Sequence, residues 1–207
     1  MNTKETAAQA ALAAVNVALA PWIAAVNARD LIFSPVATFL SRIVNAVSAS
    51  DVDVDVIADV KTIARKLTGR RATPKPAPAP APAPVPPAPP AATASASQLS
   101  FDSRIENFDK LIQLLLTQPG YAPNEADLKI PALQTLLTTM KADNLAVINA
   151  NTALSNARIT RNKALYDPST GLVIIANDVT NYIKSVFGPS SPQYKQVSKV
   201  KFQRIKI

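Results

Sequence analysis

The side chains best suited to chemistry in this sequence are two runs of basic residues in which no acid occurs. One run follows Asp59 and the other follows Asp178, and together they carry most of the net charge of +8. Clustered Lys and Arg predict a surface for nucleic acid, anionic lipid or an acidic partner, and a solvated basic end to each half is the alternative. The candidate basic patches are Lys61, Arg65, Lys66, Arg70 and Arg71, and Lys195, Lys199, Lys201, Arg204 and Lys206.

A second group of polar side chains recurs at heptad spacing in the stretch 131–166. Its heptad positions are apolar early, at Leu133, Leu137 and Met140, and polar late. In a helix, such polar positions line one side of a seam, where buried polar residues can fix the register between chains. An ordinary core followed by a solvated face is the alternative. The candidate seam residues are Asn144, Asn151, Arg158, Arg161 and Asn162.

The commonest catalytic groups are missing from the sequence. It contains no His and no Cys, which removes the usual general base, the usual zinc ligands and the thiolate nucleophile. The glycine patterns G-x-G-x-x-G and G-x-x-x-x-G-K-[ST], which cradle phosphates, are also missing. We therefore predict a protein that is not an enzyme, with no catalytic, cofactor-binding or metal site.

The elements that must position these side chains are predicted to be helices. Apolar residues recur every three or four positions in the stretches 36–47, 57–67, 101–115 and 172–186, and polar residues lie opposite. Ser103 with Glu106 fits a capping box, Ser191 precedes a proline suited to the first helical position, and Pro131 is suited to open a helix. Pro21 is predicted to kink or split the first, alanine-rich helix.

A Pro/Ala tract divides the chain into two helical halves. Pro74–Pro90 contains ten prolines, which predict an extended linker because proline supplies no backbone N–H for a helix. The expected fold class is all-α, with one or more helical bundles built from two similar halves. The expected domains are an N-terminal helical segment at 1–72, the Pro/Ala-rich linker at 73–98, and a C-terminal helical domain with a basic tail at 99–207.

The two halves resemble each other in layout. A long helix ends at an aromatic-x-Pro turn in both, and an amphipathic helix and a basic segment follow. The alignment pairs Phe33 with Tyr166, Ile43 with Ile183, and Lys61 with Lys201. An internal duplication explains this similarity, and chance likeness between amphipathic helices is the alternative.

Localisation is predicted from what the apolar stretches lack. The N-terminal stretch has no strong Leu/Ile/Val block of the kind that export signals contain, and polar residues and Pro21 interrupt it. We therefore expect a cytoplasmic protein without a membrane span. The last nine residues, KVKFQRIKI, alternate basic and apolar side chains, which is the pattern of an exposed strand.

Five segments of the chain carry a resemblance to other proteins. They are the basic segment Lys61–Arg71, the segment Ser97–Ser103, the turn Tyr121–Glu125, the helix end Asn156–Tyr166, and the stretch Tyr182–Lys195. Together they resemble a group of uncharacterised helical proteins from Bacteroidetes-type bacteria. The resemblance covers most of the chain outside the Pro/Ala tract, and it implies a helical protein without implying an activity.

These patterns favour a structural, assembly or scaffold protein that acts through helix packing. Such a protein is expected to form a homo-oligomer or to belong to a larger protein assembly. The alternative is a basic helical protein that binds nucleic acid or another anionic polymer.

Overall fold

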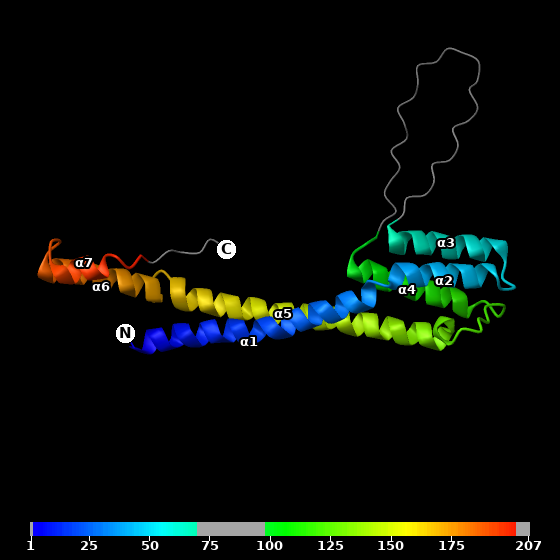
Figure 1. The fold of residues 1–207 in the computed structure, drawn as a ribbon, viewed down its shortest axis with the longest axis horizontal. Helices are drawn as coiled ribbons and strands as arrows, with labels where there is room; N and C mark the ends of the chain where they lie inside the picture. Colours follow the sequence, from blue (N-terminus) through cyan, green and yellow to red (C-terminus); the bar gives the residue numbers. More distant parts are fainter. Residues whose placement is uncertain (1, 70–97, 202–207) are drawn as a thin grey trace, which may run out of the picture. The chain divides into compact units, whose positions relative to one another are not determined.

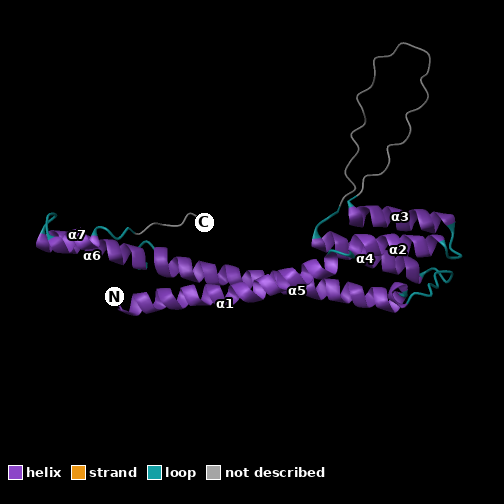
Figure 2. Cartoon of the chain, viewed as in Figure 1, coloured by secondary structure: helices purple, strands orange, loops and turns teal. Residues whose placement is uncertain are grey.

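The structure is a computed structural model that describes residues 2–69 and 98–201. The described residues form seven α-helices and one short 3-10 helix, with no strand among them (Figures 1 and 2). The all-α prediction is therefore confirmed for this part of the chain. The tract Pro74–Pro90 lies outside it, as do Arg70, Arg71, Arg204 and Lys206 and most of the C-terminal strand pattern. In chain order the elements are α1 (Asn2–Phe33), α2 (Val36–Ser48), α3 (Val54–Thr68), α4 (Phe101–Leu116), η1 (Ala126–Leu128), α5 (Ile130–Tyr166), α6 (Leu172–Phe187) and α7 (Pro192–Val197).

The chain forms two compact units, and each draws on both sides of the Pro/Ala tract. The central unit comprises Asn27–Leu145, and the terminal unit comprises Met1–Val26 with Ala146–Ile207. This division cuts across the predicted segments 1–72 and 99–207. The reason is that the long helices α1 and α5 each contribute one part to the central unit and the other part to the terminal unit.

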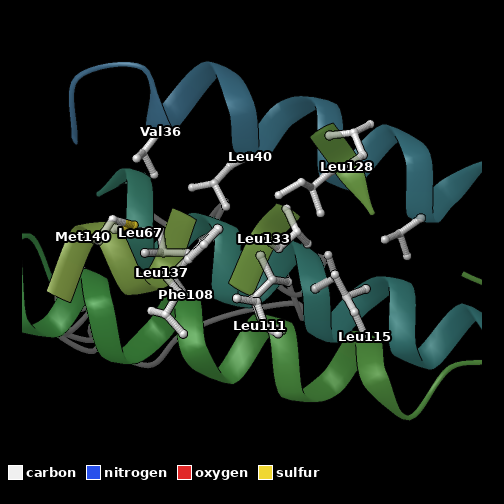
Figure 3. Packing of buried hydrophobic residues seen from close by; sticks show 14 of the residues in the cluster. Val36, Leu40, Leu67, Phe108, Leu111, Leu115, Leu128, Leu133, Leu137 and Met140 are labelled. Carbon is white, nitrogen blue, oxygen red and sulfur yellow. The ribbon is translucent and has the colours of Figure 1, made fainter. Parts of the chain in front are cut away.

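The core of the central unit is formed by apolar side chains of α2, α3, α4 and α5, joined by Phe33 at the end of α1, by Tyr121 and by Leu128 of η1. Figure 3 shows residues of α2, α4 and α5 converging with Leu67 of α3 and Leu128 of η1. The early heptad positions of α5 point into this core, as their apolar character predicts. Among the most deeply buried side chains are Phe33, Leu40, Ile43, Leu67, Phe108, Leu111, Ile112, Leu115, Leu133 and Met140.

The ends of several helices differ from the predicted ones. Helix α4 begins earlier than expected, because the hydroxyl of Ser100, rather than that of Ser103, caps it by accepting a hydrogen bond from the Ser103 N–H at 3.1 Å. Helix α1 continues through Pro21, so the expected split is absent. Proline removes a single backbone hydrogen bond, and the other bonds of this 32-residue helix hold it together. The predicted cap at Ser191 with Pro192 behind it is confirmed, and Pro131 lies in the first turn of α5 as predicted.

The two flanks of the Pro/Ala tract lie beside each other in the central unit. The N–H of Gln98 donates to the carbonyl of Lys66, with 3.4 Å between nitrogen and oxygen. The Gln98 side chain then accepts a hydrogen bond from the buried amide of Asn107 at 2.7 Å. The end of α3 and the residues just before α4 are therefore neighbours within the central unit.

The similar halves show the same order of elements but different packing. A long helix, an aromatic-x-Pro turn and a second helix occur in both. However, Ile43 is fully buried while Ile183 is only partly covered. Lys61 lies within α3, whereas Lys201 follows α7 outside any helix. The internal duplication remains a prediction.

The terminal unit has a thinner core than the central unit. Its buried side chains include Ala8 and Ala11 of α1, Leu154 of α5 and Ala176 of α6. The turn between α5 and α6 is fixed by one carboxylate oxygen of Asp167, which accepts hydrogen bonds from the N–H groups of Ser169 and Thr170. These bonds hold the pKa of Asp167 well below its usual range, because they favour the charged form.

The loop between α4 and η1 is closed by Tyr121, whose hydroxyl donates to the Leu128 carbonyl at 2.8 Å. Burial, with Asp127 and Glu125 nearby, raises the pKa of Tyr121 to about 12. We expect Tyr121→Phe to lower the free energy of unfolding by about 1–2 kcal/mol at neutral pH, because a buried carbonyl loses its donor. Chemical denaturation of both proteins measures this difference.

The same pair of proteins tests the pH dependence. The folded pKa of Tyr121 lies above its unfolded value of about 10, so its contribution is complete below that pH and is lost as pH rises towards 12. The advantage of the wild type over Tyr121→Phe should therefore shrink across this window. An advantage that stays constant to pH 12 would contradict the buried, neutral state of the phenol.

Candidate functional site

A cluster of polar and aromatic side chains lies where α1, α4 and α5 meet in the central unit. The Arg29 guanidinium lies 3.6 Å from the centroid of the Phe101 ring, which is a cation–π contact. Arg29 also donates to the Asn144 Oδ1 at 3.4 Å, and the Asn144 Nδ2 donates to the Asp102 Oδ1 at 2.7 Å. One amide on α5 therefore links a residue of α1 to a residue of α4.

A second arginine completes this cluster at the end of α1. Arg104 donates a hydrogen bond to the backbone carbonyl of Phe33 at 2.8 Å. Its guanidinium also lies 5.0 Å from the centroid of the Phe33 ring. The Phe33 ring in turn meets the Phe101 ring edge-on, with 4.9 Å between centroids. The last carbonyls of a helix lack intrahelical donors and carry partial negative charge. A guanidinium at this position donates a hydrogen bond to such a carbonyl and also brings a positive charge close to it.

The cluster links three helices through contacts that are largely enclosed. Both arginines are partly enclosed, and their Nε atoms are buried without a hydrogen-bond partner among the described residues. Burial lowers the pKa of Arg104, because a charged group is less well solvated there. The one carboxylate of the cluster, that of Asp102, accepts a hydrogen bond from the Asn144 amide. Across the residues that the structure describes, no group of three or more His, Cys, Asp or Glu could hold a metal ion.

The five predicted seam residues do not form one continuous seam. Asn144 is buried, and its partners come from the same chain. Asn151 and Arg158 are exposed in the terminal unit. Arg161 and Asn162 are half-buried and bind each other, with the Arg161 Nε and terminal nitrogen donating to the Asn162 Oδ1 at 3.1 and 2.8 Å. The hydrogen-bond partners of Asn144, Arg29 and Asp102, belong to the same chain. A role between chains stays a prediction for all five residues.

Sequence reasoning missed the partners of Asn144. Arg29 occupies the same heptad position in α1 as Ala8, Val15 and Trp22, which are all buried or half-buried. A charged residue at the end of an otherwise apolar stripe signals a polar partner on the facing helix. That signal was present in the sequence. The residues Asp102 and Arg104 had no comparable pattern, because their role depends on where α4 begins.

The predicted basic patches are divided between the two units. In the central unit, Lys61 and Arg65 line an open groove of about 550 Å³ between α2 and α3. Arg65 donates to the Thr62 hydroxyl at 2.7 Å. Lys66 is half-buried on the same helix and does not line the groove. The groove is lined by Leu40, Ser41, Val44, Asn45, Ala58, Lys61, Thr62, Ala64, Arg65 and Thr68.

The basic residues of the terminal unit are more exposed. Lys195, Lys199 and Lys201 are all exposed, and none of them pairs with a described acid. The nearby Lys184 ammonium lies 5.7 Å from the centroid of the Tyr194 ring, which joins α6 to α7. Binding of an anionic partner at these lysines stays a prediction.

No family model, curated protein sequence or solved structure matches this chain. The resemblance to helical proteins of Bacteroidetes-type bacteria therefore stays an expectation. Functional inference rests on the surfaces of the molecule itself.

The N-terminal helix carries exposed apolar side chains, among them Val17 and Leu31. Of the described residues, one helical stretch, Thr3–Ser48, is long and apolar enough to cross a membrane by length and composition. Only 6% of its most apolar window is buried within the structure. The expected absence of a membrane span and the cytoplasmic location both remain predictions.

Proposed function

We propose that this protein is a non-enzymatic structural protein that assembles through helix packing and oligomerisation. The observation that carries the proposal is the outer face of α1. Residues 6–28 contain no charged side chain. A helix face that meets only water normally carries charged and polar residues. We therefore expect an uncharged, exposed face of this length to be buried against a partner.

The apolar residues on this face are large and well exposed. Val17 and Leu31 are 74% and 75% exposed, and Leu12 and Ile23 are almost half exposed. Helix α5 also carries exposed apolar side chains, at Leu145, Ile148 and Ile159. Single exposed apolar residues are common on monomers, but a series along a long helix marks an interaction surface.

Other copies of this chain are the partner that we propose. The opposite stripe of α1 already contains buried residues, Ala8 and Ala11. The exposed face also includes the polar residues Gln9, Asn16 and Asn27, which cost free energy in lipid and are tolerated between helices. Closed symmetric assembly covers such a face with the same face of a neighbour.

Replacement of Val17 by Glu tests this proposal. The side chain is exposed, so the substitution should leave the helical content unchanged while placing a charge on the proposed interface. We expect the wild type to self-associate at micromolar concentration in analytical ultracentrifugation and Val17→Glu to weaken this by about tenfold or more, because a buried unpaired charge is costly. The matched control is Asn156→Glu, which adds the same charge at an exposed position of α5.

Two outcomes would contradict assembly as the function. One is a wild type that stays monomeric across the micromolar range. The other is flotation of the wild type with uncharged phosphatidylcholine vesicles that Val17→Glu abolishes, which would assign the face to a membrane. Self-association that Val17→Glu leaves unchanged would keep the assembly role but exclude the outer face of α1.

The alternative function is binding of nucleic acid or another anionic polymer, and the exposed lysines 195, 199 and 201 favour it. Such binding weakens steeply with salt, because each phosphate contact releases counterions. Retention on a heparin or DNA column at low salt, lost at high salt and reduced by changing all three lysines to Gln, would support this function. Association that is insensitive to these changes supports assembly alone.

A further inference from the structure

We propose that two copies of this chain pair through the outer faces of α3 in antiparallel orientation. This inference rests on the proposed function, because it assumes that the chain self-associates. It names a specific contact that lies in the central unit and is separate from the outer face of α1.

The charges of α3 are separated by sign along the helix. Asp53 caps the helix, and Asp55 and Asp59 follow. The charged residues of α3 after residue 60 are all basic. Acids at the start and bases at the end of a helix suit its own dipole. They also make the helix complementary to a second copy that runs in the opposite direction.

No ion pair between described residues involves a charge of α3, although Asp53 accepts a hydrogen bond from the Asp55 N–H and Arg65 donates one to the Thr62 hydroxyl. The three ion pairs between described residues are Arg42–Asp127, Lys110–Glu106 and Lys141–Asp109, and all of them lie off α3. Asp55, Asp59 and Lys61 are exposed, while Arg65 and Lys66 are half-buried. The helix thus presents two acids and three bases outward without an ionic partner among the described residues.

The outer face of α3 has the spacing of a helix-packing stripe. Five residues of this face follow alternate steps of four and three, which keeps them on one side of the helix. They are Val54, Ala58, Lys61, Arg65 and Thr68. Val54 is 76% exposed although it is apolar. Ala58 lies in the stripe and has a short side chain, which allows a close approach of two helix backbones.

An antiparallel pair centred near residue 60 brings opposite charges to the same level. Asp55 of one copy then lies level with Arg65 of the other. Because the arrangement is two-fold symmetric, this pair occurs twice. Asp59 and Lys61 are two residues apart and lie on opposite sides of α3, so they do not form a second pair. A parallel pair would instead place acid against acid and base against base.

The neighbouring helix is compatible with this contact. The part of α2 that lines the groove contributes Leu40, Ser41, Val44 and Asn45, none of which is charged. The hydroxyl of Ser41 donates to the Ala37 carbonyl at 3.2 Å, so its donor is already used within the helix. A partner helix that packs beside α3 therefore contacts apolar and uncharged polar side chains of α2.

Charge reversal with rescue tests the pairing. We expect Arg65→Asp and Asp55→Arg each to raise the dissociation constant of self-association by about tenfold or more, because each creates two like-charge contacts. The double variant Asp55→Arg/Arg65→Asp should return towards the wild-type value, since the pairs are restored with opposite sign. The control is Lys129→Asp, which reverses an exposed, unpaired charge elsewhere in the central unit.

The double variant also separates pairing from helix stability. Each reversal opposes the dipole of α3, so the double variant is the worst of the three for the helix itself. Restored association in the double variant, with helical content followed by circular dichroism, supports the pairing. Association that is lost further in the double variant would show that these charges serve only the helix, and the pairing would be wrong.

The result also distinguishes this inference from the proposed function. If the wild type self-associates and Arg65→Asp associates equally well, the pairing through α3 is excluded while assembly through another face stands. If the wild type is monomeric at all concentrations tested, both are excluded.

Discussion

Gly120→Ala is expected to destabilise the central unit by about 2–3 kcal/mol. A Cβ at this position would lie 1.8 Å from the carbonyl oxygen of Asp51 and 2.7 Å from its carbonyl carbon. These atoms belong to the backbone between α2 and α3, so a side-chain rotation cannot relieve the overlap. The two loops would have to separate, and the buried side chains on the flanking helices would lose contacts.

The sign of this effect is informative. At a position without steric conflict, Gly→Ala stabilises a protein by about 0.4–1 kcal/mol, because it restricts the unfolded chain. Hydrogen exchange of peptides from α2 and α4 measures the change within the central unit, and protection should fall by about 30- to 150-fold. Unchanged or increased protection would contradict the close approach. Gln118→Ala in the same loop is the control, with an expected change within about 0.5 kcal/mol.

Asn144→Ala is expected to cost about 1–3 kcal/mol of the free energy of unfolding. The variant removes the hydrogen bonds to Arg29 and Asp102 and leaves the enclosed guanidinium with fewer partners. It also leaves a space among buried side chains, since Asn144 is 6% exposed. Chemical denaturation followed by circular dichroism measures the loss.

The chain supplies a matched control for this change. Asn151 lies one heptad later on α5, has the same side chain and is exposed. Asn151→Ala is therefore expected to change the free energy of unfolding by no more than about 0.5 kcal/mol. Equal effects of the two substitutions would show that the cluster around Asn144 contributes nothing beyond helix propensity.

The helices themselves were predictable from the sequence because their signals are local. Apolar residues at steps of three and four determine which side of α2, α3 or α4 faces a core, and this depends only on the geometry of one helix. The cap at Ser191 with Pro192 is local for the same reason. The cap of α4 is Ser100 and not Ser103, although Ser103 with Glu106 matches the capping-box pattern and Ser100 does not.

The partners of each helix were decided by the tertiary structure. The sequence placed Asn144 in a polar seam, but only the fold brings Arg29, 115 positions earlier, within hydrogen-bond reach of it. The same holds for Gln98, whose N–H reaches the carbonyl of Lys66, 32 positions earlier, only in the folded central unit. A heptad pattern specifies that a face will be covered, and the free energy of packing over the whole chain selects the helix that covers it.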